Sequence, residues 1–310
     1  MRCASIDVGT NTVLLLVMEP NGRLEELHDA ATITRLGEGL LGSGRLIRPA
    51  MERTVKALEG YRRILDELGA ETVDCFGTSA LREAENRDEF LEMAQRRAGI
   101  TVRVLSEYEE AYYTYLSVKD DARIEGEELL IIDIGGGSTE LALGDRHRFT
   151  GYVSLPIGTV KLTERFIGHD PPLPEEVERL SVFVREQVGP ARLGLGPDGS
   201  GSRSIVGTAG TATTLAAILL GLKEFDKKRI HGMVVSLPTL REWRDRLLHM
   251  TAPERKGLPG MVPGREDVLP QGVVLMEEIV AAFGCAHFTV STAGARHGVL
   301  YEVLRNRQAP

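Results

Sequence analysis

A short sequence pattern occurs twice in this chain, 126 residues apart (7 to 133). Each copy is an apolar, β-branched segment that ends in Asp-x-Gly, with Asp7 and Gly9 in one copy and Asp133 and Gly135 in the other. Self-similarity at a fixed offset usually marks a repeated structural unit. Because the chain has 310 residues, it has room for about two domains at roughly 150 residues each. The pattern therefore predicts an internal duplication.

The segments around the first copy predict a β-meander followed by alternating helices and strands. Residues 2–8, 12–18 and 24–33 alternate in polarity and are separated by turns rich in Gly and Asn, which is typical of three strands. Apolar periodicity then predicts helices at 49–68, 79–84, 88–97 and 107–118 and strands at 72–76 and 101–105, before a charged candidate linker at 119–127.

The second half repeats this plan. Strands are predicted at 128–134, 138–143, 204–207 and 287–290, and helices at 159–167, 175–188, 212–220, 237–250, 268–283 and 296–304. A stretch rich in Gly and Pro, 189–202, is predicted to be a loop. Strands followed by helices in both halves predict an α/β fold with two domains built on mixed sheets.

Composition excludes several classes of protein. Lys and Arg number 37 against 45 Asp and Glu, a net charge of −8, so a globally basic nucleic-acid binder is excluded. The same total argues against a polyanionic ligand, although net charge does not determine the charge inside a cleft. Three widely spaced cysteines exclude a disulfide framework and favour a reducing compartment. No segment reads as a signal peptide or as the ~18 apolar residues of a membrane span, so we expect a cytoplasmic protein with no membrane partner.

Two glycine-containing turns follow the repeated strands and carry candidate anion-binding groups. They are DVGTNT at 7–12 and DIGGGSTE at 133–140. Glycines let backbone N–H groups approach an anion closely, and adjacent hydroxyls add donors. A carboxylate at the strand end needs a cation between itself and a phosphate, and Mg²⁺ suits that place. Either turn alone could be an ordinary hairpin, but two in register with a duplication favour a phosphate site.

A third turn, GTAGT at 207–211, leads directly into a predicted helix. A helix N-terminus presents unpaired N–H groups and the positive end of the helix dipole to an anion. Its threonines could also serve as ordinary N-caps, which is compatible with that role. Together the three turns predict a cleft that holds phosphates between two related domains.

The chain resembles the exopolyphosphatase/guanosine pentaphosphate phosphohydrolase family, in the superfamily of acetate and sugar kinases, heat-shock chaperone ATPases and actin. The resemblance rests on IDVGTNT (6–12), GTSALREA (77–84), SEYEEA (106–111), IIDIGGGSTEL (131–141), LPIGTVKLTE (155–164), GTAGTATTLA (207–216) and STAGARHGVLYEVL (291–304). It implies two ribonuclease H-like domains with an interdomain cleft. We place them at 1–122 and 123–310, with the last helix packing back on the first domain.

The resemblance also implies catalytic and metal-binding residues. Glu110, the second Glu of EEA, matches the proposed general base, and Arg82 matches an arginine that would bind phosphate oxygens. The neighbouring Glu109 could raise the pKa of that base, or could simply serve the helix dipole. Residues 107–108 are Glu-Tyr where the family often has Gly followed by a polar residue. The carboxylates matched to metal and phosphate are Asp133 and Glu140, with Asp7 in the equivalent place of the first turn.

The candidate phosphate-binding residues come from the three turns and from two further motifs. Lys161 and Arg296 are cations in those further motifs and could instead be exposed helix residues. The full set is Gly9, Thr10, Asn11, Gly135, Gly136, Ser138, Gly207, Thr208, Gly210, Thr211, Lys161 and Arg296.

The expected activity is Mg²⁺-assisted hydrolysis of the terminal phosphoanhydride of inorganic polyphosphate, with Mn²⁺ as a possible substitute for Mg²⁺. Guanosine pentaphosphate (pppGpp) is the competing substrate of the same class. One alternative of a different class is a sugar- or acetate-type kinase, which would need a phosphate acceptor. Another is a non-hydrolysing nucleotide sensor, but the intact EEA and IDIGGGSTE segments argue against it, because a sensor does not need the base. We expect a homodimer and no nucleic-acid partner.

Overall fold

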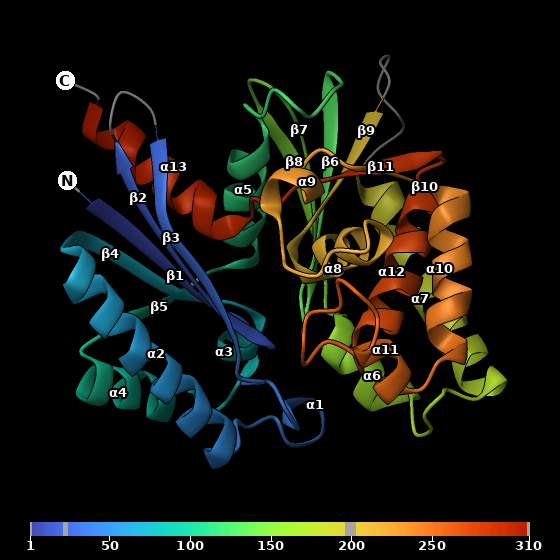
Figure 1. Cartoon of the computed structure of the whole chain (residues 1–310), viewed down its shortest axis with the longest axis horizontal. Coiled ribbons are helices and arrows are strands. Elements are labelled where there is room, and N and C mark those ends of the chain that lie inside the picture. Colours follow the sequence, from blue (N-terminus) through green and yellow to red (C-terminus); the bar gives the residue numbers. More distant parts are fainter. Residues whose placement is uncertain (1, 21–23, 196–202, 309–310) are drawn as a thin grey trace. The chain divides into compact units, whose positions relative to one another are not determined.

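The structure is a computed structural model that describes residues 2–20, 24–195 and 203–308. Its internal contacts divide the chain into two compact units (Figure 1). Unit 1 comprises residues 1–117 and 295–310, and unit 2 comprises residues 118–294. The division thus falls at 117/118 where the sequence suggested 122/123, and the last helix belongs with unit 1.

Unit 1 contains a five-stranded mixed sheet in the order β3-β2-β1-β4-β5. Strands β1, β2 and β3 form an antiparallel meander, whereas β4 and β5 continue the sheet parallel to β1. The strands are β1 (Arg2–Val8), β2 (Thr12–Pro20), β3 (Leu24–Ile33), β4 (Ala70–Gly77) and β5 (Val102–Val104). The helices are α1 (Leu40–Ser43), α2 (Arg48–Leu68), α3 (Ser79–Glu83), α4 (Arg87–Ala98), α5 (Glu107–Val118) and α13 (Ala295–Gln308).

The alternation of side chains along β1 decides which helix covers each face of this sheet. Ala4, Ile6 and Val8 point into a core shared with α2 and α4, which lie side by side (Figure 1). Cys3, from the other face, packs with Leu300 and Leu304 of α13. The sheet of unit 1 is therefore covered on both faces, and its second cover comes from the far end of the chain.

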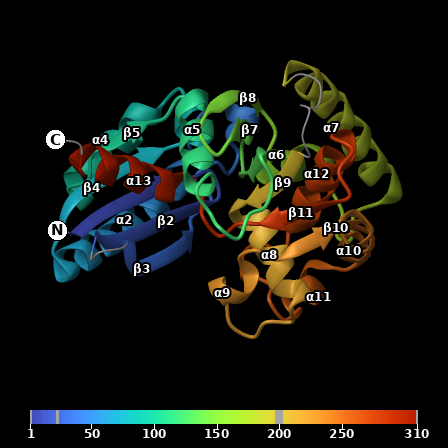
Figure 2. The same ribbon diagram turned by 90° about the horizontal axis from the view of Figure 1, so that it is seen from above.

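Unit 2 contains a six-stranded sheet in the order β10-β11-β9-β6-β7-β8. Its large core consists of apolar side chains of β6, β7 and β9 together with those of α7, α8, α10 and α12. Figure 2 shows these helices next to the sheet. The strands are β6 (Glu128–Ile134), β7 (Thr139–Asp145), β8 (Phe149–Leu155), β9 (Arg203–Thr208), β10 (Val234–Ser236) and β11 (His287–Val290). The helices are α6 (Thr159–Phe166), α7 (Pro174–Gly194), α8 (Ala209–Leu219), α9 (Lys227–Ile230), α10 (Leu237–His249), α11 (Ala252–Lys256) and α12 (Leu269–Ala282).

The two sheets share one topology, as the repeat predicts. An antiparallel meander (β3-β2-β1 and β8-β7-β6) is extended by parallel strands (β4-β5 and β9-β11), and β10 is added antiparallel at the edge of unit 2. The turns also match, because the N–H of Gly9 donates to the carbonyl of Thr12 and that of Gly135 to Ser138. This is the predicted ribonuclease H-like arrangement, present twice.

Several elements differ from the sequence-based expectation. Strand β8 and the short elements α1, α9, β10 and α11 were not expected. Helix α7 continues through Pro190 to Gly194, where a loop was expected, and residues 196–202 of that expected loop lie outside the described residues. None of the helices in the described part combines the length and apolarity that a membrane crossing requires.

Candidate active site

The candidate residues of unit 1 gather at the carboxyl ends of its parallel strands. The 9–12 turn follows β1, Arg82 lies on α3 directly after β4, and Glu110 lies in the first turn of α5, after β5. The three strand ends are tied together, because Thr78 N–H donates to Val8 O and Leu105 N–H donates to Gly77 O. Open α/β sheets bind ligands at this end of their parallel strands.

Arg82 and Glu110 form an ion pair inside this cluster. Nη1 of Arg82 donates to Oε2 of Glu110 at 2.8 Å and to the carbonyl oxygen of Leu105 at 3.0 Å. Glu110 is only 8% exposed. A guanidinium at this distance favours the ionised carboxylate, which is the form a general base needs.

Glu109, the other carboxylate of the EEA segment, has a structural role. Its Oε2 accepts from both the backbone N–H and the hydroxyl of Ser106 at 2.8 Å, which closes a capping box at the start of α5. The backbone hydrogen bond from Ser106 is the main cause of the lowered pKa of Glu109. Glu109 is thus engaged at the cap, and the charged partner of Glu110 is Arg82.

The first turn is held by a neighbouring segment. Backbone N–H groups of Thr34 and Arg35 donate to Asn11 O, and that of Gly37 donates to Thr10 O. A Cβ at Gly37 would lie 2.3 Å from Thr10 Cγ2, so this approach requires glycine. Within the described residues, both polar side-chain atoms of the buried Asn11 lack a hydrogen-bond partner. Buried amides are normally satisfied, so this side chain is suited to receive a ligand oxygen.

In unit 2 the candidate carboxylates lie next to each other on adjacent strands. Asp133 is the register partner of Glu140 on β7 and of Thr208 on β9. Side chains of directly opposed residues lie on one face of a sheet, with Cβ atoms about 4.5–5.5 Å apart. Glu140 is 1% exposed, and its Oε1 accepts from Ser154 Oγ at 3.1 Å. Asp7 is the equivalent of Asp133 in unit 1, but its partners there are Leu14 and Phe76.

The second turn is closed by the start of α6. Thr159 N–H donates to Gly135 O, while the N–H groups of Val160 and Lys161 both donate to Gly136 O. Lys161 therefore lies beside this turn, with its Nζ 3.4 Å from Pro156 O. Ser138 at the end of the turn is 4% exposed.

In the third turn, Gly207 and Thr211 pack against neighbouring elements, whereas Gly210 contacts a cation. A side chain does not fit at Gly207, since a Cβ there would lie 2.9 Å from the Phe288 ring, and Thr211 packs against Gly272 of α12. The hydroxyl of Thr208 donates to Ile132 O. At Gly210 the guanidinium of Arg265 occupies the place of the missing Cβ, which would lie 1.7 Å from its Nη1.

Arg265 is a candidate site residue that the sequence did not reveal, because a single Arg after Pro-Gly carries no local signal. Burial lowers its pKa to about 10, since a desolvated cation is disfavoured. The turn it touches contains Ala209, whose φ of 59° is left-handed, and Arg35 beside the first turn has a φ of 52°. Such strain in residues other than glycine is often found at ligand sites. Both cases here adjoin turns that the sequence singled out.

Arg296 is placed elsewhere. Its Nη2 donates to both carboxylate oxygens of Asp29 on β3, at 3.1 and 2.8 Å, and its backbone oxygen accepts from Ser5 Oγ. The guanidinium therefore serves the attachment of α13 to the sheet of unit 1. The structure does not bring it together with the turns.

Comparison with known proteins gives consistent matches over nearly the whole chain. Residues 16–307 match the model of the Ppx/GppA phosphatase family. Exopolyphosphatase 2 of Mycobacterium tuberculosis is 36% identical over 288 residues, covering 90% of this chain and 89% of that protein. A solved family member from Aquifex aeolicus has a TM-score of 0.82 at 33% identity, covering 100% of this chain and 99% of its own. An exopolyphosphatase from Cytophaga hutchinsonii has a TM-score of 0.90 at 29% identity, covering 99% and 98%.

Proposed function

The chain belongs to the Ppx/GppA phosphatase family, and from this premise we propose that it hydrolyses the terminal phosphoanhydride of inorganic polyphosphate. The relative from Mycobacterium tuberculosis is named an exopolyphosphatase and matches this chain over 89% of its own length. The proposed reaction transfers the terminal phosphoryl group to water and releases inorganic phosphate together with a chain shortened by one unit.

The ion pair of Arg82 with Glu110 is the observation that carries the proposal. In it a buried carboxylate sits at the carboxyl ends of parallel strands, with a guanidinium 2.8 Å away. Glu110 would orient the attacking water and accept its proton. The guanidinium of Arg82 would bind phosphoryl oxygens, where negative charge is concentrated in the transition state.

Each unit has its own glycine turns, and we propose that these turns supply phosphate-binding groups. Phosphoryl transfer needs little covalent chemistry from the protein, so positioning and charge stabilisation account for most of the catalysis. Backbone N–H groups of the glycine turns and the side chain of Asn11 would accommodate phosphate oxygens. The guanidinium of Arg265 would add positive charge beside Gly210, and Lys161 would do so beside the second turn.

The carboxylates of unit 2 fit a hard divalent cation. Asp133 and Glu140 are register partners on β6 and β7, and such a pair together with substrate oxygens is the ligand set that Mg²⁺ favours. Asp133 and Glu140 would hold Mg²⁺, or Mn²⁺, in unit 2, and Asp7 is the candidate at the equivalent position of unit 1. When bound, the ion would neutralise charge on the phosphate oxygens.

A phosphate-release assay on the purified protein tests the function. It compares short polyphosphate, long polyphosphate, pppGpp and ATP, with Mg²⁺ present and after chelation by EDTA. We expect release from polyphosphate without any acceptor and loss of release after chelation. Equal or faster release from pppGpp would shift the assignment to the guanosine pentaphosphate phosphohydrolase of the same family. Turnover that needs a sugar or acetate acceptor would overturn it in favour of a kinase.

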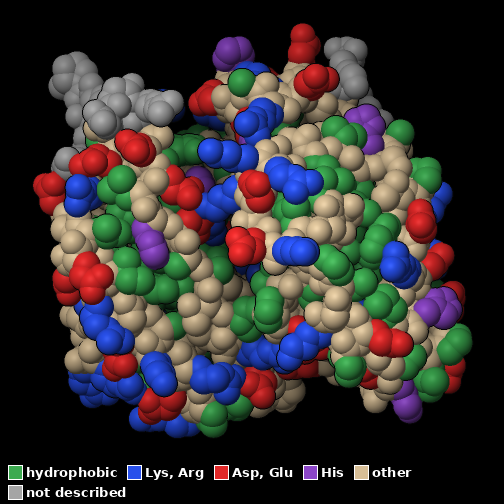
Figure 3. Space-filling view, in the orientation of Figure 1, with side chains coloured by type: hydrophobic (Ala, Val, Ile, Leu, Met, Phe, Trp, Pro, Cys, Tyr) green, Lys and Arg blue, Asp and Glu red, His purple; other side chains and the backbone are tan. Residues whose placement is uncertain are grey.

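The remaining expectations concern the state of the protein in the cell. We propose a cytoplasmic homodimer, a proposal supported by the resemblance and by the composition of the chain. Acidic and basic side chains are interspersed on the visible face (Figure 3), in keeping with a protein that does not attract nucleic acid through one large basic field. Light scattering on the purified protein measures the oligomeric state.

A further inference from the structure

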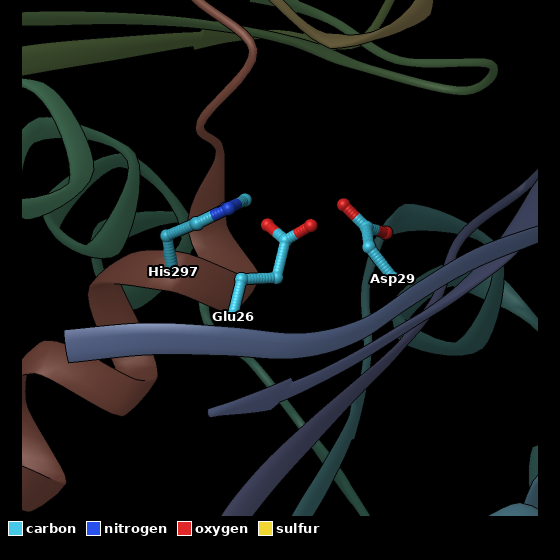
Figure 4. Close-up of side chains that lie close together, drawn as sticks. All are labelled: Glu26, Asp29 and His297. Carbon is cyan, nitrogen blue, oxygen red and sulfur yellow. The ribbon is translucent and has the colours of Figure 1, made fainter. Parts of the chain in front are cut away.

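Three potential metal ligands meet in unit 1, away from the turns described above. They are Glu26 and Asp29 on β3 and His297 in the first turn of α13. One ligand atom from each lies within 4.8 Å of the other two. Figure 4 shows the His297 ring directed toward the Glu26 carboxylate, with the Asp29 carboxylate facing both.

A β-bulge places the two carboxylates on one face of the sheet. Residues three apart on a regular strand point to opposite faces, so Glu26 and Asp29 would normally be separated. The register shifts here, since Val17 pairs with His28 while Met18 pairs with Glu26, which leaves Leu27 as the extra residue. A bulge of this kind changes the direction in which the following side chains point.

The cross-strand partners show which face this is. Glu26 is opposite Met18 and Asp29 is opposite Leu16, and both partners pack with Leu300 and Leu304 of α13. Leu27, by contrast, joins the core on the α2 side. The bulge thus directs both carboxylates toward the helix that carries His297.

The donor set combines two buried groups with one exposed carboxylate. His297 is 7% exposed, the side chain of Asp29 is 9% exposed, and Glu26 is exposed. Asp29 accepts from Arg296 Nη2, and since each carboxylate oxygen has two lone pairs, it can keep this bond and still bind a cation. Imidazole with carboxylates suits Zn²⁺ and related first-row metals, whereas Mg²⁺ prefers oxygen ligands and retains its waters.

We propose that Glu26, Asp29 and His297 form a binding site for a divalent transition-metal cation of the Zn²⁺ class. The ion would join β3 to the start of α13, beside the ion pair of Arg296 with Asp29. Three protein ligands leave at least one position for water. The site lies level with Cys3 and Ser5 of β1, since Met18 pairs with Cys3 and Leu16 with Ser5. The proposed metal site does not depend on the proposed phosphatase reaction.

Isothermal titration of the chelator-treated protein with Zn²⁺ tests this site. Because Asp133 and Glu140 can also take Zn²⁺, the site is identified by the difference between variants. The test variants are Glu26→Gln and His297→Ala, and the matched controls are the exposed neighbour Glu25→Gln and the exposed His287→Ala. Substitution of Co²⁺ for Zn²⁺ supplies a visible absorption band as a second readout.

We expect that one of the Zn²⁺-binding events has a Kd that rises by at least about tenfold in each test variant and is unchanged in both controls. The Co²⁺ band should change in the test variants alone. Because Glu26 is exposed, we expect Glu26→Gln to fold, so this variant still tests the site if His297→Ala folds poorly. Zn²⁺ binding that is identical in wild type and Glu26→Gln, or absent from the wild type, would overturn the proposal and leave the three residues as a hydrogen-bonded cluster.

Discussion

Nη1 of Arg82 lies 2.8 Å from Oε2 of Glu110, and the same nitrogen lies 3.0 Å from the carbonyl oxygen of Leu105. One guanidinium therefore joins helix α3, the end of β5 and the first turn of α5. Arg82 fixes the position of the carboxylate, and a guanidinium with its five N–H donors can contact several oxygens at once. The structural role of the pair and its proposed catalytic role can be tested separately.

Replacing Glu110 with Gln removes the proposed base while keeping an oxygen that can accept from Arg82. We expect phosphate release to fall by about 10²–10⁴-fold, the usual contribution of general base catalysis. Binding of polyphosphate should remain, and a filter-binding assay measures it beside the turnover. The control is Glu109→Gln, which should retain activity and lose about 0.5–1 kcal/mol of stability with the helix cap. Wild-type turnover in Glu110→Gln would contradict the assignment.

Arg82→Lys keeps the positive charge but loses the forked geometry. A lysine cannot bind Leu105 O, Glu110 and a phosphate oxygen simultaneously in the same planar arrangement. We expect kcat to fall by about 10²-fold, comparable to the loss of one preorganised donor. The exposed Arg87→Lys, just beyond α3, is the control and should match the wild type in steady-state kinetics. An unchanged kcat in Arg82→Lys would show that the reaction does not depend on the forked geometry of the guanidinium group.

Gly210→Ala places a methyl group where the Arg265 guanidinium lies, 1.7 Å from Nη1. Alanine favours a helix by about 1 kcal/mol over glycine, so the local backbone tolerates the change and the guanidinium has to move. We expect kcat/KM for polyphosphate to fall by at least about tenfold in Gly210→Ala. The kcat/KM of Arg265→Gln should fall by a similar factor.

Gly60→Ala in α2 is the matched control for Gly210→Ala. A Cβ at Gly60 meets nothing within 4 Å, so this variant should gain about 0.4–1 kcal/mol of stability with unchanged kinetics. If Gly210→Ala behaves like Gly60→Ala, Arg265 has no part in substrate binding.

Glu176 provides a test of pH dependence in unit 2. Its pKa is lowered to about 2, first by the hydrogen bond with His169 and next by the backbone N–H of Leu173. A lowered acid pKa stabilises the fold above the ordinary value near 4.5, and this stabilisation is lost as the pH falls toward 2. The Tm of Glu176→Gln should therefore lie below that of the wild type at pH 6, and the two should converge between about pH 4.5 and 2.

Glu178→Gln, at an exposed position of the same helix, is the control for this measurement. Its Tm should follow the wild type at every pH in thermal melts recorded by circular dichroism. A difference for Glu176→Gln that persists at the acid end of the series would mean that the carboxylate acts through packing instead of charge.

The sequence predicted most elements because their signals are local. Strand β8 was missed although the repeat allowed it, since moving β3 forward by the 126-residue offset gives 150–159 and β8 is Phe149–Leu155. The Gly- and Pro-rich stretch 189–202 predicts a loop, whereas helix α7 continues through Pro190 to Gly194. A proline costs ~3 kcal/mol in a helix interior, but apolar residues of α7, among them Val188 and Ala191, are buried in the core around it.

Local sequence patterns are enough to predict the duplicated sheets, the three glycine turns and the family, because the residues of each pattern lie only a few positions apart. Which distant side chains meet is settled only when the chain folds. The pairing of Arg82 with Glu110, the contact of Arg265 with Gly210, and the joining of Glu26, Asp29 and His297 each depend on the folded chain. The reason is physical: strand order and register, including a single bulge at Leu27, decide which distant side chains share a face, and no local pattern encodes that choice.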